Sequence, residues 1–333
     1  MRLYIADFNG VLTDLKEKYK AHLVSPRDAD AWILWQDVRG SYSDLIKASK
    51  AYYPKPVYCV QHGRGATSDY AEPNKMPLLA DKFLCWGSSD YDRMCNLGYK
   101  ERTHIIGCPL NPAIAPKVLH KEKIVLFVPI STGKEEPENI AIYYELLKLR
   151  YHKAQIKILD NRVSLKDKWG FDDKRGVSFR EINTTFDVIA KLLPWHERSL
   201  YHGNVVTGFQ DSPTNNQLVF NLLRNVDLVV GLDEGTTEIF AYAHDIPVVI
   251  CDGFKYRQYN EDAKNYTLIE GYKTKAATHC SLRDLAETIN QELEHPERLK
   301  KERLEVAEAE MGLSYTNPTE NIMRIIKRDI KKA

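Results

Sequence analysis

The sequence predicts an α/β protein with two domains, each built around a mainly parallel β-sheet. Short apolar segments of strand length alternate with longer amphipathic segments along the 333 residues, and this alternation is typical of βαβ units. The prolines Pro109, Pro112 and Pro116 interrupt the series before it starts again. Because a single domain usually holds roughly 100–200 residues, the length also favours two domains.

The expected strands form two series, one on each side of these prolines. The first series covers residues 3–7, 31–35, 57–62, 83–86 and 104–107, and the second covers residues 124–129, 155–159, 205–208, 228–232 and 247–251. Helical patterns cover residues 43–52, 90–96, 138–149, 216–224, 236–244 and 281–294, and the charge-rich segment 296–333 is also mostly helical. We therefore expect an N-terminal Rossmann-like domain over residues 1–114, a C-terminal Rossmann-like domain over 115–310, and a final helix over 311–333.

Composition and charge exclude several classes of protein. Lys and Arg number 47 against 46 Asp and Glu, a net charge of +1, which excludes a strongly basic nucleic-acid binder but not a local basic groove. Apolar residues make up 43% and charged residues 28%, as in ordinary globular proteins, so disorder is excluded as the main state. No segment approaches the roughly 20 apolar residues of a membrane-spanning helix. The acidic residue Asp7 lies close to Met1, whereas a signal peptide begins with a basic segment followed by an apolar one, so none is expected.

The cysteines indicate a reducing environment. The six cysteines include no CxxC pair. Cys59 and Cys85 lie within apolar segments, which predicts that they are small core residues. Because unpaired thiols are typical of reducing compartments, we expect a cytoplasmic protein.

Residues 227–250 carry the most informative motif of the chain. The segment is predicted to run from an apolar strand through a turn of small residues into a helix, with Gly235, Thr236 and Thr237 at the helix start. The free N–H groups and the dipole of a helix N-terminus bind phosphate, and Glu238 in the first turn would reach a ribose. An equally good interpretation is that a threonine caps the helix and Glu238 completes the cap.

This segment resembles the donor-binding motif of the GT-B glycosyltransferases. In that family a strand of the C-terminal domain leads through small residues to a glutamate, and a proline opens the next strand. Here these features are residues 235–237, Glu238 and Pro247, although Ile239 stands where the family usually has alanine. The resemblance implies that residues 235–237 contact the donor diphosphate and that Glu238 holds the donor ribose.

Residues 80–112 strengthen this resemblance. A strand ends in Trp-Gly at residues 86–87, a helix ends in Leu-Gly-Tyr at 97–99, and a short strand ends in Gly-Cys-Pro at 107–109. The series is similar to the end of the N-terminal domain in the branch with CDP-glycerol glycerophosphotransferases, polysaccharide-biosynthesis proteins and UDP-GlcNAc 2-epimerases. The resemblance implies two Rossmann-like domains that face a cleft, with the C-terminal helix packed back on the N-terminal domain.

A predicted strand over residues 57–62 ends at His62 and is followed by Gly63 and Arg64 on the acceptor side. Ligands of α/β proteins bind at the carboxyl ends of parallel strands. His62 would therefore act as general base on an acceptor hydroxyl, and Arg64 would hold a phosphate. The branch named above has a similar strand-His-Gly turn, in which the histidine is a catalytic candidate. The alternative is a turn histidine bonded to the backbone. The Gly-x-Gly at 63–65 lacks the third glycine of a dinucleotide-binding loop.

Two further polar loops complete the predicted site. Ser131, Thr132 and Lys134 follow the first strand of the second domain. The resemblance implies contacts between these residues and the donor phosphates, with a solvated loop as the alternative for Lys134. Asn9 and Gly10 follow the first strand of the chain and would line the acceptor side.

The segment 7–14 also resembles the signature of the haloacid-dehalogenase phosphatases. That resemblance implies that Asp7 is a nucleophile. Asn9 stands where the family has a second aspartate that acts as general acid, so the acid function would be lost.

Together these residues predict a metal-independent glycosyltransferase. It would move a sugar or polyol phosphate from a nucleotide-activated donor to a hydroxyl of a carbohydrate, polyol or modified nucleic-acid acceptor. No cofactor is expected, because the nucleotide sugar or CDP-polyol is a co-substrate, and helix N-termini and cations supply the electrostatic stabilisation. The alternatives are a 2-epimerase of the same fold, a glycosyltransferase acting on modified DNA bases, a dehalogenase-type phosphatase, and a non-catalytic nucleotide-sugar binder.

Overall fold

The computed structural model of the protein contains two compact units. It describes residues 1–6, 11–35, 37, 40–52, 54–64, 70, 77–110, 123–128, 141–142, 145–146, 149, 154–159, 205–206, 223–252, 258–260, 265–267 and 274–331. The described residues of unit 1 lie within 1–110 and 307–331, and those of unit 2 lie between 123 and 306. The chain therefore returns to unit 1 within helix α11 (Lys300–Met311).

Unit 1 is built on a five-stranded parallel sheet. Its strands lie in chain order and are β1 (Leu3–Ala6), β2 (Ala31–Leu34), β3 (Val57–Val60), β4 (Lys82–Cys85) and β5 (Thr103–Ile105). All five strands were expected from the apolar segments of the sequence. Their parallel pairing confirms the α/β class.

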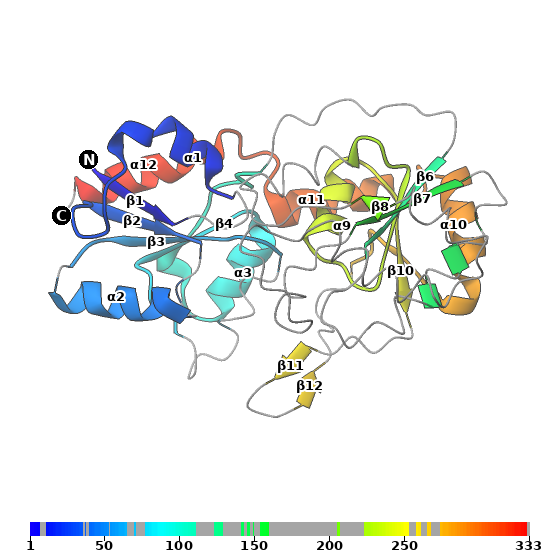
Figure 1. Ribbon diagram of the computed structural model, residues 1–333, viewed down its shortest axis with the longest axis horizontal. Helices are drawn as coiled ribbons and strands as arrows, with labels where there is room; N and C mark the ends of the chain where they lie inside the picture. Colours follow the sequence, from blue (N-terminus) through cyan, green and yellow to red (C-terminus); the bar gives the residue numbers. More distant parts are fainter. Residues whose placement is uncertain are drawn as a thin grey trace. The chain divides into compact units, whose positions relative to one another are not determined.

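Helices cover both sides of this sheet. They are α1 (Thr13–Lys18), α2 (Gly40–Tyr52), α3 (Ser88–Asn96) and α12 (Pro318–Ile330), with short 3-10 turns at Lys20–His22 and Lys100–Arg102. Figure 1 shows α2 and α3 on one side of the sheet and α1 and α12 on the other. The side chains of a strand alternate between these two sides. Trp32, Cys59 and Phe83 accordingly share a core with Ile46 of α2 and Met94 of α3.

Helix α12 covers the opposite side of the unit 1 sheet. Its buried residues include Ile322 and Ile326, which lie one turn apart on a single helix face. The hydroxyl of Tyr58 on β3 donates to Asp329 of α12 at 3.3 Å. The C-terminal helix thus packs on the N-terminal unit, which confirms the expectation from the sequence.

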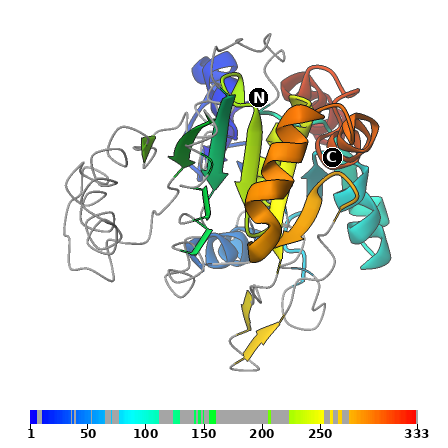
Figure 2. The same cartoon turned by 90° about the vertical axis from the view of Figure 1, so that its right-hand side faces the viewer.

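Unit 2 is built on a six-stranded parallel sheet. Its strands are β6 (Lys123–Val128), β7 (Ala154–Leu159), β8 (Val205–Val206), β9 (Leu228–Gly231), β10 (Val248–Asp252) and β13 (Thr278–Ser281). Val125 and Phe127 of β6 pack with Leu285 and Ile289 of helix α10, which lies across the sheet in Figure 2. A separate antiparallel pair is formed by β11 (Gln258–Asn260) and β12 (Asn265–Thr267).

The expected helix 281–294 is wrong at its start. Strand β13 runs to Ser281, a 3-10 turn covers Leu282–Asp284, and helix α10 (Leu285–Glu294) begins only after it. The edge strand β13 is half exposed and carries polar residues, so it lacks the apolar run that marks the inner strands. In the part of the chain that the structure describes, each helix is too short or too polar to cross a membrane.

Candidate functional site

The strand order of the unit 2 sheet reverses between β6 and β9. The sheet order is β13-β10-β9-β6-β7-β8, so the chain builds outward from β6 in one direction and then returns to build from β9 in the other. Open α/β sheets bind ligands outside the carboxyl ends of the strands at such a reversal. Helix α9 (Thr236–Ala243) begins shortly after the carboxyl end of β9.

The first turn of α9 brings together the residues predicted for the donor. Gly235 is extended and forms the N-cap, and Thr236 and Thr237 open the helix. The Gly235 N–H donates to Glu238 Oε2 at 2.9 Å, so Glu238 caps the helix through its own carboxylate. The part of the predicted cap that involves Glu238 is therefore confirmed, but the expected threonine cap is wrong, because Gly235 is the N-cap and both threonines lie inside the helix. The ribose contact of Glu238 stays a prediction.

Glu238 is buried beneath this turn. Its exposed fraction is 3%, and burial raises the pKa of its carboxyl to about 8, with Asp233 and Glu234 raising it further. A Cβ atom on Gly231 would lie 2.8 Å from Glu238 Oε1. The absence of a side chain at the end of β9 thus makes room for the buried carboxyl.

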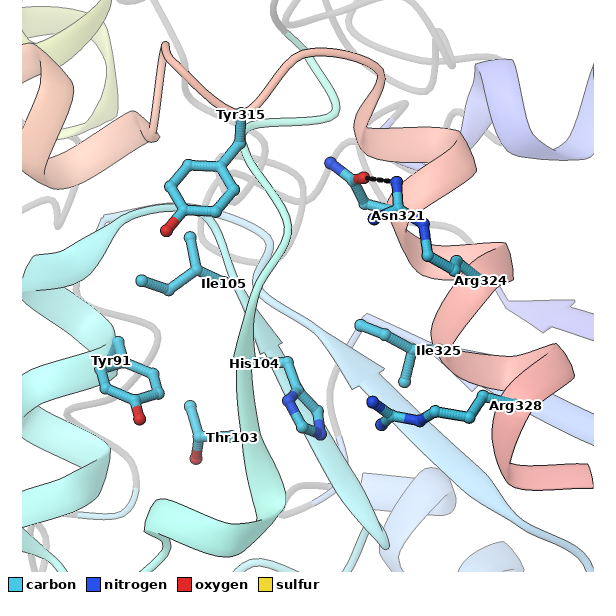
Figure 3. Close-up of a pocket in the computed structure, with 9 residues that line it drawn as sticks. All are labelled: Tyr91, Thr103, His104, Ile105, Tyr315, Asn321, Arg324, Ile325 and Arg328. Atoms are coloured by element: carbon cyan, nitrogen blue, oxygen red, sulfur yellow. Dashed lines mark hydrogen bonds between the residues drawn. The ribbon is translucent and has the colours of Figure 1, made fainter. Parts of the chain in front are cut away.

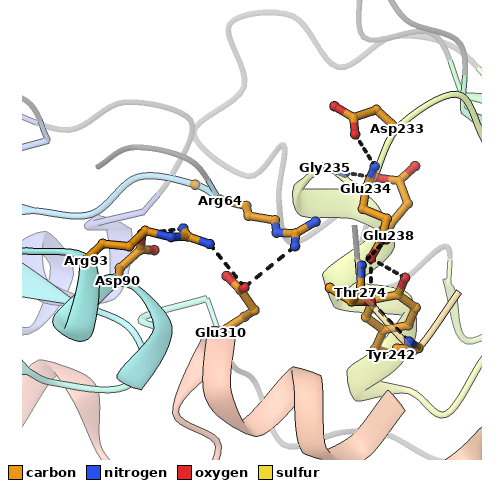
Figure 4. Close-up of polar contacts among 12 residues, drawn as sticks. Arg64, Asp90, Arg93, Asp233, Glu234, Gly235, Glu238, Tyr242, Thr274 and Glu310 are labelled. Atoms are coloured by element: carbon orange, nitrogen blue, oxygen red, sulfur yellow. Dashed lines mark hydrogen bonds and ion pairs between the residues drawn. The ribbon is translucent and has the colours of Figure 1, made fainter. Parts of the chain in front are cut away.

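Sequence reasoning missed Glu234, the carboxylate that ties this turn to the rest of the sheet edge. Glu234 accepts hydrogen bonds from the Tyr242 hydroxyl and from the N–H and hydroxyl of Thr274, each at 2.7 Å. Burial by itself would raise the pKa of Glu234, but the ion pair with His279 and the hydrogen bonds from Thr274 and Tyr242 lower it below its usual value. Figure 4 shows this network beside the first turn of α9.

His279 links Glu234 to the end of strand β10. Its Nε2 lies 3.5 Å from Glu234 Oε1 and its Nδ1 lies 3.2 Å from Asp252 Oδ1. The ion pair with Glu234, supported by Asp252, raises the pKa of His279 against the opposing effect of burial. The available sequence signal was Asp252, a polar residue directly after an apolar strand, but its partners are distant in the chain.

In unit 1, His62 lies just past the carboxyl end of β3. Its Nδ1 lies 3.1 Å from the Trp35 carbonyl oxygen, and its ring meets the Trp35 ring edge-on at 4.9 Å between centroids. When Nδ1 donates to that carbonyl, the basic lone pair of the ring is on Nε2. The contact with the backbone that was expected for a structural turn histidine is therefore present. The same contact favours the tautomer with its proton on Nδ1, which a general base acting through Nε2 needs. The catalytic role stays a prediction.

Arg64 is buried in an ion-pair cluster within unit 1. Its side chain is 3% exposed, and its Nη2 lies 3.6 Å from Glu310 Oε1 on α11. Arg93 approaches the same carboxylate at 3.8 Å and pairs with Asp90 at 3.0 Å (Figure 4). The Gly63 carbonyl oxygen accepts a hydrogen bond from the side-chain Nε2 of Gln61 at 3.1 Å. The phosphate contact predicted for Arg64 stays a prediction. A bound phosphate would compete with the Glu310 carboxylate for the Arg64 guanidinium.

The remaining predicted residues lie outside the described part of the chain. They are Asp7, Asn9 and Gly10 of the first loop and Ser131, Thr132 and Lys134 after β6. The described candidates therefore form two groups. One is the α9 turn in unit 2, and the other is the His62–Arg64 turn in unit 1.

Comparisons with known proteins identify the fold. No family model matches the chain, and no curated protein matches its sequence. A UDP-N-acetylglucosamine 2-epimerase described as putative, from Listeria monocytogenes, is 13% identical with a TM-score of 0.54, and the match covers 97% of this chain and 79% of that one. S. aureus MnaA in complex with UDP is 13% identical with a TM-score of 0.53, over 98% and 80% of the two chains.

The wall teichoic acid polymerase TagF has a similar fold. A TagF variant soaked with CDPG is 12% identical with a TM-score of 0.56, and the match covers 99% of this chain and 89% of that one. At this level of identity the likeness concerns the fold alone. It confirms that the protein has the GT-B-like fold that the sequence motifs predicted.

Proposed function

We propose that this protein is a glycosyltransferase that moves a sugar or polyol phosphate from a nucleotide-activated donor to an acceptor hydroxyl. The observation that carries the proposal is the start of helix α9 at the strand-order reversal of unit 2. A helix N-terminus at that position offers backbone N–H groups and a positive dipole end to a diphosphate. The fold shared with proteins that bind UDP or CDPG supports the same conclusion.

The proposed donor contacts involve two loops of unit 2. Gly235, Thr236 and Thr237 bind the diphosphate, and Ser131, Thr132 and Lys134, which follow β6 in the sequence, add further phosphate contacts. Glu238 binds the donor ribose after leaving its bond to the Gly235 N–H. The departing phosphate charge is stabilised by the helix N-terminus and by the cation of Lys134.

The proposed acceptor contacts involve unit 1. His62 Nε2 takes the proton of the acceptor hydroxyl, and Asn9, Gly10, Gly63 and Arg64 contact the acceptor. With a sugar donor, the hydroxyl oxygen bonds to the anomeric carbon while the bond to the nucleoside diphosphate breaks. With a CDP-polyol, the oxygen bonds to phosphorus and CMP leaves with the electron pair. In both cases His62 holds the proton until it is released to solvent.

A nucleotide-sugar 2-epimerase is the second candidate function. Epimerisation needs more acid and base groups near the donor than a transferase does. The grouping of Glu234, Asp252 and His279 at the sheet edge favours this candidate. Incubation with UDP-GlcNAc alone separates the two, because an epimerase converts the sugar without an acceptor.

The donor assignment is tested by nucleotide binding. Wild-type protein is first screened by thermal shift against UDP-, CDP- and GDP-linked donors, since ligand at 100 times its Kd stabilises the native state by about 2.7 kcal/mol. Calorimetry of the ligand found is then repeated with Thr237→Val and Glu238→Ala. Both variants should bind at least roughly tenfold more weakly, as expected when a hydrogen bond to a charged group is lost.

The matched control is Thr288→Val on helix α10, which should bind the nucleotide as wild type does. Unchanged affinity in both turn variants would show that the α9 turn does not hold the donor. His62→Ala should bind the donor normally and lose transfer. A variant with full turnover would contradict the base assignment, and a wild-type protein that binds without turnover would be a non-catalytic binder.

A further inference from the structure

A cavity of about 510 Å³ lies along the outer edge of the unit 1 sheet. It is bounded by strand β5, helix α3 and helix α12, all within unit 1 (Figure 3). Strand β5 is the last strand of the described sheet. None of the residues assigned to donor or acceptor binding lines this cavity. Its volume falls within the roughly 300–1,000 Å³ of small-molecule sites.

One wall of the cavity is cationic. Arg324 and Arg328 lie one turn apart on α12 and both line the cavity (Figure 3). Residues four apart on a helix are neighbours on one face, so both guanidinium groups can reach a single ligand. The Asn321 side-chain oxygen accepts a hydrogen bond from Arg324 at 2.6 Å, and this contact limits the freedom of the guanidinium. The lining residues include no aspartate or glutamate.

His104 also lines this wall, and it does not neutralise the positive charge of the arginines. Its ring lies beside Arg328 in Figure 3, and its buried Nε2 makes no hydrogen bond to the described residues. Burial, followed by the positive charges of Lys82 and Arg328, lowers the pKa of His104, and Asp329 and Glu101 oppose this only in part. The lowered pKa favours the neutral ring, so His104 adds little positive charge. Arg328 Nε pairs with Asp329 Oδ1 at 3.3 Å, so an anion bound in the cavity would share Arg328 with this carboxylate.

The facing wall is aromatic and apolar. Tyr91 of α3, Ile105 of β5 and Tyr315 before α12 lie across the cavity from the arginines (Figure 3). Tyr315 is 42% exposed, which is high for a large side chain with a hydrophobic ring. Tyrosine rings combine a flat apolar surface with a polar tip, and they bind planar ligands at little cost in conformational entropy.

We propose that this cavity binds a small organic anion, whose phosphate or carboxylate pairs with Arg324 and Arg328 and whose flat apolar part packs against Tyr91 and Tyr315. Planar guanidinium groups bind both anions in bidentate geometry. The cavity is a second ligand site, separate from the nucleotide site proposed in unit 2. The chemistry of its two walls requires a ligand with both an anionic head and an apolar body.

Calorimetry with simple probes tests the proposal. Phenyl phosphate and benzoate represent the two anionic heads on one ring, while inorganic phosphate and phenol represent the separate halves. At least one of the two complete probes should bind with a Kd of about 1 mM or below. Each half should bind roughly tenfold more weakly than the complete probe, because it contacts only one wall. Binding of neither complete probe, or binding of inorganic phosphate as tight as that of phenyl phosphate, would overturn the proposal.

Charge variants on one helix locate the site. Arg324→Gln and Arg328→Gln should each weaken binding of the complete probe by roughly tenfold or more, since each removes a hydrogen bond to a charged group. Lys327→Gln is the matched control, because Lys327 lies on the same helix but faces the Tyr19 ring, with Nζ 6.0 Å from its centroid. An equal loss with Lys327→Gln would indicate nonspecific attraction to α12 and overturn the proposal.

A second comparison separates this site from the nucleotide site. Thr237→Val in unit 2 should leave binding of the probe unchanged, and the double variant Arg324→Gln/Arg328→Gln should leave nucleotide binding unchanged. Loss of probe binding in Thr237→Val would place the probe at the α9 turn and refute the second site. Failure of nucleotide binding in wild type would refute the proposed function without affecting the cavity.

Discussion

At the scale of single residues, Glu238 caps helix α9 and also makes the free energy of unfolding depend on pH. Its buried carboxyl has a pKa of about 8 in the folded protein, against roughly 4.3 for an exposed glutamate. Between these values the folded state binds more protons than the unfolded state, so the free energy of unfolding falls as pH rises. The contribution of Glu238 is fully present below about pH 4 and is lost as pH rises through 8.

The variant Glu238→Gln removes this titration while it keeps the size of the side chain. We expect its free energy of unfolding to fall less between pH 5 and pH 8 than that of wild type, as measured by urea titration at several pH values. Glu294→Gln, at an exposed position of α10, is the control and should follow the wild-type pH dependence. Parallel curves for wild type and Glu238→Gln would show that Glu238 titrates normally.

At the scale of elements, a backbone contact explains why glycine follows Trp86 at the end of β4. A Cβ atom on Gly87 would lie 2.1 Å from the Ala309 carbonyl oxygen of α11, which is far inside contact distance. The end of α11 therefore packs directly on the turn between β4 and α3. Gly312 makes the same kind of approach, since its Cβ would lie 2.4 Å from the Trp86 carbonyl oxygen.

We therefore expect Gly87→Ala to destabilise the protein by about 3 kcal/mol or more, because the clash with backbone atoms forces α11 away from the turn. Gly98→Ala is the control. Gly98 has φ +87° and nothing within 4 Å of its added Cβ, so it should cost only about 1–2 kcal/mol of backbone strain. Thermal unfolding measures both, and an equal loss in the two variants would contradict close packing at Gly87.

The inner strands and the β9–α9 turn could be predicted from the sequence because their signals are local. The strand β13 could not, since His279 and its neighbours form a polar edge strand without an apolar run. The partners of Glu234 and of Arg64 could not be predicted either. Thr274 and Glu310 reach them only through tertiary packing of distant segments, and no spacing rule in the sequence reports such contacts.

At the scale of the whole molecule, unit 1 is discontinuous in the sequence. Its sheet comes from the first 110 residues, and one side of that sheet is covered by α12 from the chain's other end. Burial of Ile322, Met323 and Ile326 removes apolar surface from water, at roughly 1.5–3 kcal/mol for each large side chain. The sum is comparable to the whole stability of a typical domain, roughly 5–15 kcal/mol.

A chain that ends at residue 306 should therefore lose the ordered structure of unit 1. We expect its thermal transition to fall in amplitude and the segment 1–110 to become sensitive to protease, because the side of the sheet that faces α12 is exposed. Addition of a peptide with residues 307–333 should restore protection, since α12 binds through its own apolar face. The control chain ends at Ile330 and should behave as wild type. Protease resistance of 1–110 without the peptide would mean that the sheet and its other helices suffice for folding, and that α12 is an accessory to unit 1.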